Sequence, residues 1–150
     1  MSQSLAKIYL HLVFGTKNRA PVLGDTVRDA LHRYTATVLQ NLGCRVVLIN
    51  SVEDHMHVLF ELARTVPVSA VVENVKKSSS KWLKMQPGME AGFAWQNGYG
   101  VFSVSASKLP TVRDYVANQR EHHRARSFQS ELRALLEKHG VEYDERYLWD

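Results

Sequence analysis

Two histidines separated by one residue, His55 and His57, lie within an apolar run of the sequence. Because side chains alternate between the two faces of a β-strand, both imidazoles are expected to project from one face. Met56 and Val58 then fall on the opposite face, which is apolar and is expected to cover a core. Neutral imidazole nitrogens that converge from one face are suitable ligands for a divalent cation, so the pattern predicts a metal site on a strand.

A second pair of polar side chains, Tyr115 and Gln119, follows later in the chain. Residues four apart lie on the same side of an α-helix, so a hydroxyl and a carboxamide are expected to project together. A tyrosine hydroxyl can attack a phosphate that a cation polarises, and an amide oxygen can be a ligand of that cation. By residue type alone, however, a tyrosine on a helix is more often a core or interface residue. The chain also holds seven histidines, so a pair at this spacing can arise by chance.

Hydrophobic periodicity predicts the elements that hold these side chains. Strands are expected over residues 7–14, 45–52, 55–62 and 100–105, and helices over 25–42, 67–83, 109–124 and 128–139. The order strand, helix, strand, strand, helix, strand predicts an α+β fold, a ferredoxin-like split βαββαβ antiparallel sheet with its main helices on one face. The helix that contains Tyr115 and one further helix follow. Since no linker or repeat interrupts the chain, residues 1–150 are expected to form a single domain.

That topology makes the first and third strands central neighbours, and it leaves the face with the histidines free for chemistry. His11, on the first strand, is expected to point to the same face as His55 and His57. It would then be close enough to contact substrate, although a structural role is favoured for it.

The order and spacing of these residues resemble the single-tyrosine HUH transposases of small bacterial insertion sequences, a superfamily that includes REP-associated tyrosine transposases. The stretch from His55 to His57 is similar to the histidine-hydrophobic-histidine metal motif. Tyr115 is similar to the family's nucleophile, and Gln119, four residues later, to its third metal ligand. Residues 95–105 and 118–123 are similar to the last strand and to the tyrosine helix. The resemblance covers nearly the whole chain and implies a catalytic transposase domain.

The resemblance implies a metal-dependent endonuclease and strand transferase. It implies cleavage and rejoining of single-stranded DNA at hairpin-containing element ends through a 5′-phosphotyrosine intermediate. The cofactor implied is Mg²⁺ or Mn²⁺, held by His55, His57 and Gln119. No nucleotide cofactor is expected, because the phosphotyrosine keeps the energy of the cleaved bond and the chain has no glycine-rich phosphate loop.

A homodimer with composite sites is also expected, mainly from the resemblance, with the histidines of one subunit working with the tyrosine helix of the other. The small and polar residues 105–108 would form a joint that lets this helix move between subunits. The alternative is a monomer whose tyrosine helix folds back on its own sheet.

Several basic and aromatic residues are candidates for contact with DNA. Three lysines of the second helix fall at helical spacing and form one stripe, which is either a solvated face or a contact with the DNA backbone. The loop after the first strand carries two further basic residues with the same alternatives. One aromatic residue near the last strand could stack on an unpaired base. These candidates are Lys77, Lys81, Lys84, Lys17, Arg19 and Tyr99.

The composition agrees with one globular domain and a polyanionic partner, since 150 residues with 45% apolar content carry a formal charge of +4. The single cysteine, Cys44, cannot form an internal disulfide and is expected in the core. No apolar stretch reaches membrane-spanning length, so we expect a cytoplasmic protein with no membrane partner.

Two other functions remain open at this stage. A domesticated relative that processes palindromes as a nuclease would share the chemistry, and only the DNA around the gene would distinguish it. A non-catalytic nucleic-acid-binding module would use the histidines for a structural ion such as zinc. The second alternative is disfavoured, because structural zinc sites normally have four ligands and only one cysteine is present.

Overall fold

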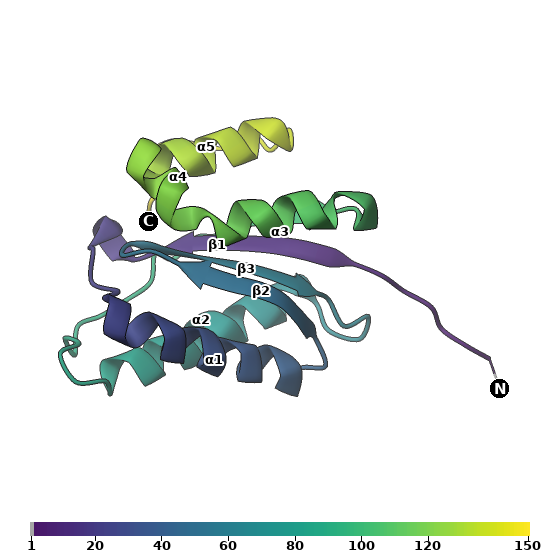
Figure 1. Ribbon diagram of the computed structural model, residues 1–150, viewed down its shortest axis with the longest axis horizontal. Helices are drawn as coiled ribbons and strands as arrows, with labels where there is room; N and C mark the ends of the chain where they lie inside the picture. The colour runs from purple at the N-terminus through teal and green to yellow at the C-terminus, as the bar shows by residue number, and fades with distance from the viewer. Residues whose placement is uncertain (1) are drawn as a thin grey trace.

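A four-stranded antiparallel sheet lies between two layers of helices in the computed structural model, which describes residues 2–150 (Figure 1). Its strands are β1 (Tyr9–Gly15), β2 (Arg45–Ser51), β3 (His55–Glu61) and β4 (Gly100–Val104). They are arranged in the order β2-β3-β1-β4, so β1 and β3 are the central neighbours. This order confirms the expected α+β class and the split ferredoxin-like topology.

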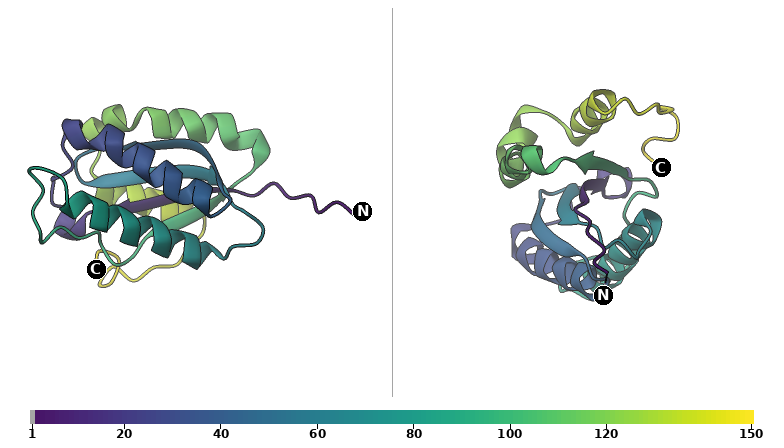
Figure 2. Two further views of the ribbon diagram at one scale, coloured as in Figure 1. Left: turned by 90° about the horizontal axis from the view of Figure 1, so that it is seen from below. Right: turned by 90° about the vertical axis from the view of Figure 1, so that its right-hand side faces the viewer.

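Five α-helices form the two layers. On one face of the sheet lie α1 (Asp25–Asn41) and α2 (Val68–Lys84), and on the other lie α3 (Leu109–Ala117), α4 (Gln119–Ala125) and α5 (Phe128–Lys138) (Figures 1 and 2). Short 3₁₀ turns, Lys17–Arg19 and Ala106–Lys108, follow β1 and precede α3. None of the helices within residues 2–150 combines the length and the apolar character that a membrane span needs.

The main core lies between the sheet and the α1–α2 layer. Alternation along β1 and β3 directs their larger apolar side chains to this face, where they are almost completely buried. Each fully buried side chain of this kind stabilises the fold by about 1.5–3 kcal/mol. The residues concerned are Leu10, Leu12, Phe14, Met56, Val58 and Phe60. Cys44 belongs to the same cluster and is buried, as expected.

The histidine face of the sheet is covered, and the expectation that it would be left free is wrong. Val13 of β1 and Phe102 of β4 also point to this face, and they are apolar. They form a second core with Phe128, Leu132 and Leu136, which recur every four residues along α5. The apolar stripe of α5 therefore covers the part of this face on which His55 and His57 stand.

The predicted single helix over 109–124 is broken at Asn118, whose φ of −98° and ψ of 26° separate α3 from α4. The Asn118 side chain donates to the Asp114 carbonyl oxygen at 2.9 Å, a local bond that competes with regular helix. From β2, Asn50 Nδ2 donates to the carbonyl oxygens of Val116 at 2.8 Å and Ala117 at 3.2 Å. These bonds satisfy groups at the end of α3 and anchor the break to the sheet.

The C-terminal tail packs back on the domain. Trp149 lies against Phe128 with ring centroids 6.1 Å apart. The backbone N–H groups of Asn97 and Gly98 donate to the Asp150 oxygen at 2.6 and 3.2 Å. The tail thus connects α5 to the segment before β4.

Candidate metal and tyrosine site

Four polar side-chain atoms from three elements converge at a buried point above β3. His55 and His57 are only 1% and 0% exposed, and their ring centroids are 5.1 Å apart. Glu131 Oε1, from α5, lies 3.1 Å from His55 Nε2 and 2.8 Å from His57 Nε2. Gln119 Oε1, from α4, lies 3.1 Å from His55 Nε2. The structure therefore brings together the three residues expected to bind metal, and it adds a carboxylate.

The Nδ1 atom of each of these two histidines has a separate hydrogen-bond partner. Asp54 Oδ1 is 2.7 Å from His55 Nδ1, and His11 Nε2 is 2.7 Å from His57 Nδ1. A carboxylate partner requires a proton on Nδ1 of His55. Burial, and then the neighbouring His57, hold the pKa of His11 well below its ordinary value, so the neutral ring can accept a hydrogen bond from the Nδ1–H of His57. Both partners orient the rings so that the Nε2 atoms of His55 and His57 point to the centre. His11 thus orients His57, which specifies the structural role expected of it.

Tyr115 lies beside the histidines of its own chain. Its ring centroid is 5.9 Å from that of His57 and 6.2 Å from that of His11. The ring of His122 stacks on that of Tyr115 with centroids 4.6 Å apart. Burial, and then the negative charge of Glu131, raise the pKa of Tyr115 above its ordinary value. The phenol is therefore protonated at neutral pH, and its ionisation needs nearby positive charge.

Tyr115 and Gln119 reach the site by a route that differs from the one expected. They were predicted to share one face of a continuous helix, but the break at Asn118 places them on α3 and α4. Gln119 is fully buried. Its Nε2 donates to the Tyr115 carbonyl oxygen at 3.5 Å, so its Oε1 is turned to His55.

Glu131 is the residue of this cluster that sequence reasoning missed. It is 2% exposed and stands within the apolar stripe of α5 between Phe128 and Leu132. Burial alone would raise its pKa, but hydrogen bonds with His55 and His57 outweigh burial and hold the pKa well below its ordinary value. The sequence does contain a signal for it, because Glu131 lies three residues after Phe128, where the apolar stripe begins. A charged residue on a buried helix face needs a specific partner.

The donor set fits a divalent cation. Two imidazole nitrogens and an amide oxygen can bind Mg²⁺ or Mn²⁺, and the carboxylate of Glu131 is preferred by both ions. Cys44, the single thiol of the sequence, belongs to the core cluster on the other face of the sheet. Thiolate coordination, which structural zinc sites commonly use, is therefore not available here.

A cavity of about 570 Å³ gives access to the tyrosine between β4, α3 and α5. Tyr115 and Glu131 are among the residues that line it. Three cationic residues, Lys108, Arg126 and Lys138, also line it. The cavity therefore combines positive charge with access to the candidate nucleophile, which suits a phosphodiester.

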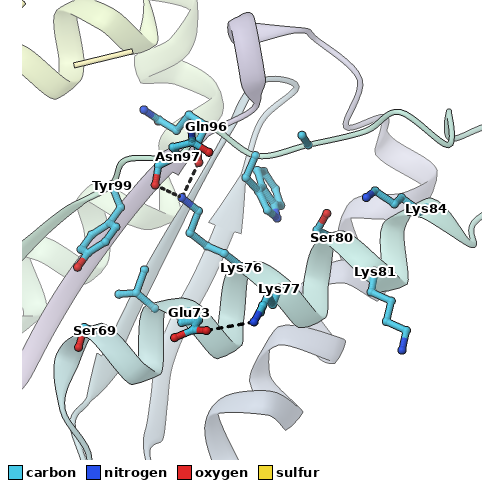
Figure 3. A pocket seen from close by; sticks show the side chains of 13 residues that line it. Ser69, Glu73, Lys76, Lys77, Ser80, Lys81, Lys84, Gln96, Asn97 and Tyr99 are labelled. Carbon is cyan, nitrogen blue, oxygen red and sulfur yellow. Dashed lines mark hydrogen bonds and ion pairs between the residues drawn. The ribbon is translucent and has the colours of Figure 1, made fainter. Parts of the chain in front are cut away.

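A second basic pocket, of about 600 Å³, lies between α2 and the segment before β4 (Figure 3). It is lined by Lys77, Lys81, Lys84 and Tyr99, so four of the six candidate DNA contacts share one surface. The other two lie elsewhere, in the 3₁₀ turn after β1.

Lys76, for which the sequence pattern predicts no role, also lines this α2 pocket and supports its wall. Its Nζ donates to the carbonyl oxygens of Gln96 at 2.5 Å and Asn97 at 3.0 Å (Figure 3). It also donates to the carbonyl oxygen of Gly98 at 2.9 Å. Burial lowers the pKa of Lys76 to about 8. Trp95 is buried, and its Nε1 donates to Ser79 Oγ at 3.0 Å.

Comparison with known proteins finds relatives that are described as transposases. The family model described as "Transposase IS200 like" matches residues 4–119. The ISDra2 transposase TnpA of Deinococcus radiodurans is 22% identical over 116 residues, which cover 74% of this chain and 83% of that protein. A crystal structure of a protein from Deinococcus radiodurans R1, assigned as a transposase, matches with a TM-score of 0.60 and 26% identity over 79% of this chain and 98% of its own. A REP-associated tyrosine transposase bound to a REP hairpin matches with a TM-score of 0.61 and 16% identity over 82% and 74%.

Proposed function

The chain belongs to the IS200-like transposase family, and from that premise we propose that it cleaves and rejoins single-stranded DNA at hairpin-containing ends, with Tyr115 as the nucleophile. One observation supports this proposal above the others. The Tyr115 ring lies 5.9 Å from His57, while Gln119 Oε1 lies 3.1 Å from His55 Nε2, all within one buried cluster. We further propose that residues 1–150 form a single catalytic domain.

The proposed reaction is an exchange of phosphodiester bonds. The Tyr115 oxygen forms a bond to phosphorus as the bond from phosphorus to the 3′ oxygen breaks. The products are a 5′-phosphotyrosine and a free 3′-hydroxyl, and the phenolic proton is balanced by the proton that the 3′ oxygen gains. Attack by a 3′-hydroxyl on the phosphotyrosine reverses the exchange and restores the tyrosine. No nucleotide is consumed, since the linkage keeps the energy of the broken bond.

The side chains around Tyr115 have separate tasks in this exchange. His55, His57 and Gln119 would hold Mg²⁺ or Mn²⁺, whose charge polarises a phosphate oxygen. Asp54 and His11 keep the two imidazoles in the orientation in which Nε2 faces the centre. The basic groups of the cavity beside Tyr115 attract the scissile strand, and the covering layer of α5 keeps bulk water from the buried cluster.

The tyrosine helix lies on the sheet of its own chain, which is the alternative to the composite site that was expected. We therefore propose a site assembled within one chain, and the homodimer stays a prediction. A mixture of Tyr115→Phe and His57→Ala subunits should remain inactive in hairpin cleavage, because neither chain has a complete site. Wild-type protein diluted into either variant should keep its own activity. Recovery of cleavage in the mixture, together with proven subunit exchange, would show that the tyrosine acts on a partner.

The α2 pocket is proposed to bind the DNA backbone through its lysine stripe. The triple variant Lys77→Ala, Lys81→Ala, Lys84→Ala should weaken hairpin binding and reduce the slope of log K against log salt by about 2 to 3, since three phosphate contacts are lost. Binding is measured by fluorescence anisotropy at several salt concentrations. Arg64→Ala, an exposed cation after β3, is the control and should leave the slope unchanged. An unchanged slope in the triple variant would assign the stripe to a solvated face.

A further inference from the structure

We propose that Glu131 is a further ligand of the metal ion, so that helix α5 completes a site otherwise built from β3 and α4. The proposal rests on the proposed function of the histidines. The family model matches the chain up to residue 119, and Glu131 lies outside that segment, twelve residues later. The metal site would thus depend on the C-terminal part of the chain.

The distances between the donor atoms agree with coordination of one ion. Ligands bound at about 2.1 Å in neighbouring octahedral positions lie about 3.0 Å from one another. Glu131 Oε1 is 3.1 Å from His55 Nε2 and 2.8 Å from His57 Nε2. Gln119 Oε1 is 3.1 Å from His55 Nε2. These three separations are those expected between neighbouring ligands of one cation, and the ligand atoms of His55, His57 and Glu131 all lie within 4.8 Å of one another.

The hydrogen bonds at the Nδ1 atoms of His55 and His57 also favour a cation between the Nε2 atoms and Glu131. Asp54 and His11 occupy the Nδ1 atoms of His55 and His57, so both Nε2 atoms face the carboxylate oxygen. Each Nε2 carries either the proton of a hydrogen bond to Glu131 or, once that proton is lost, a lone pair that can bind a cation. Lone pairs at these separations repel unless a proton or a metal ion lies between them. Glu131 also adds the single negative charge that a set of two imidazoles and one amide lacks, which strengthens binding of a divalent ion.

Helix α5 holds Glu131 in a fixed position. Ser127 caps the helix by accepting from the Ser130 N–H at 3.2 Å. Phe128 stacks on His55 with ring centroids 4.5 Å apart. It occupies the space above Gly15, where a Cβ would lie 2.5 Å from Phe128 Cε2. A carboxylate supported in this way is preorganised for coordination.

The test is a calorimetric titration of the full chain with Mn²⁺ in the absence of DNA. Glu131→Gln keeps the shape of the side chain and removes its charge, and it should weaken Mn²⁺ binding by about tenfold or more. Glu137→Gln removes an exposed carboxylate from the same helix and should change the affinity less than twofold. His57→Ala should abolish the binding.

The possible outcomes separate this proposal from the proposed function. Equal or tighter Mn²⁺ binding by Glu131→Gln, with binding still lost in His57→Ala, overturns the role of Glu131 alone. Wild-type protein whose Mn²⁺ binding does not depend on His57 would overturn the metal site as a whole. If Glu131→Gln fails to fold, the role of Glu131 is tested on the wild-type protein by nuclear magnetic resonance. Its Glu131 carboxyl ¹³C resonance should shift on addition of Mg²⁺ while that of Glu137 does not, and the absence of a shift overturns the proposal.

Discussion

Replacement of Tyr115 by phenylalanine is expected to lower the rate of single-strand cleavage on the order of 10⁴-fold or more and to remove the covalent DNA adduct. The change deletes one oxygen atom and keeps the ring that packs against His11, His57 and His122. The loss is therefore chemical and should leave the fold intact. It is measured with a labelled hairpin oligonucleotide and Mn²⁺ on a denaturing gel, where the adduct migrates with the protein. Double-stranded DNA of the same sequence should not react.

The matched control for this variant is Tyr34→Phe. Tyr34 stacks on Trp82 with ring centroids 5.5 Å apart and lies on α1, on the other side of the sheet. Its hydroxyl has no part in the proposed reaction, so this variant should cleave like the wild type. An adduct that still forms in Tyr115→Phe would show that another residue is the nucleophile.

Removal of either histidine of β3 should abolish cleavage while hairpin binding persists. His57→Ala and His55→Ala are each expected to lower the cleavage rate by about 10³-fold or more, because several kcal/mol of charge stabilisation at the phosphate are lost. Hairpin binding should change little, since recognition depends on basic groups elsewhere on the surface. Single-turnover cleavage and fluorescence anisotropy measure the two effects separately on the same protein.

A histidine outside the site gives the control for these variants. His32 lies on α1, and its Nε2 is 2.7 Å from Ser51 Oγ. His32→Ala removes an imidazole of equal size without touching the cluster, so its cleavage rate should stay near that of the wild type. Full activity in either β3 variant, or in wild-type protein with excess chelator, would count against a metal role for the pair.

The sheet and the histidine pair could be predicted from the sequence because both depend on a local pattern. Alternation along residues 7–14 and 55–62 reports which face of a strand is buried, and this rule places His55 and His57 together whatever the rest of the chain does. The order of the elements then restricts the topology to few choices. The strand ends found in the structure differ from the expected ones by at most two residues.

The remaining features depend on contacts between distant segments. The break at Asn118 is anchored by Asn50, and nothing near Asn118 in the sequence indicates that partner. Glu131 interrupts an apolar stripe, but its histidine partners lie more than seventy residues away. Periodicity over 109–124 therefore predicted one helix, and the covering of the histidine face by α5 could be found only in three dimensions.

The most direct test of the account identifies the residue that is bonded to DNA. Wild-type protein is reacted with a hairpin oligonucleotide and Mn²⁺, digested with trypsin and nuclease, and analysed by tandem mass spectrometry. We expect one modified peptide, in which Tyr115 carries the phosphate from the 5′ end of the cleaved strand. A phosphate attached to any other residue, an attachment through the 3′ end, or cleavage without any protein adduct would contradict it.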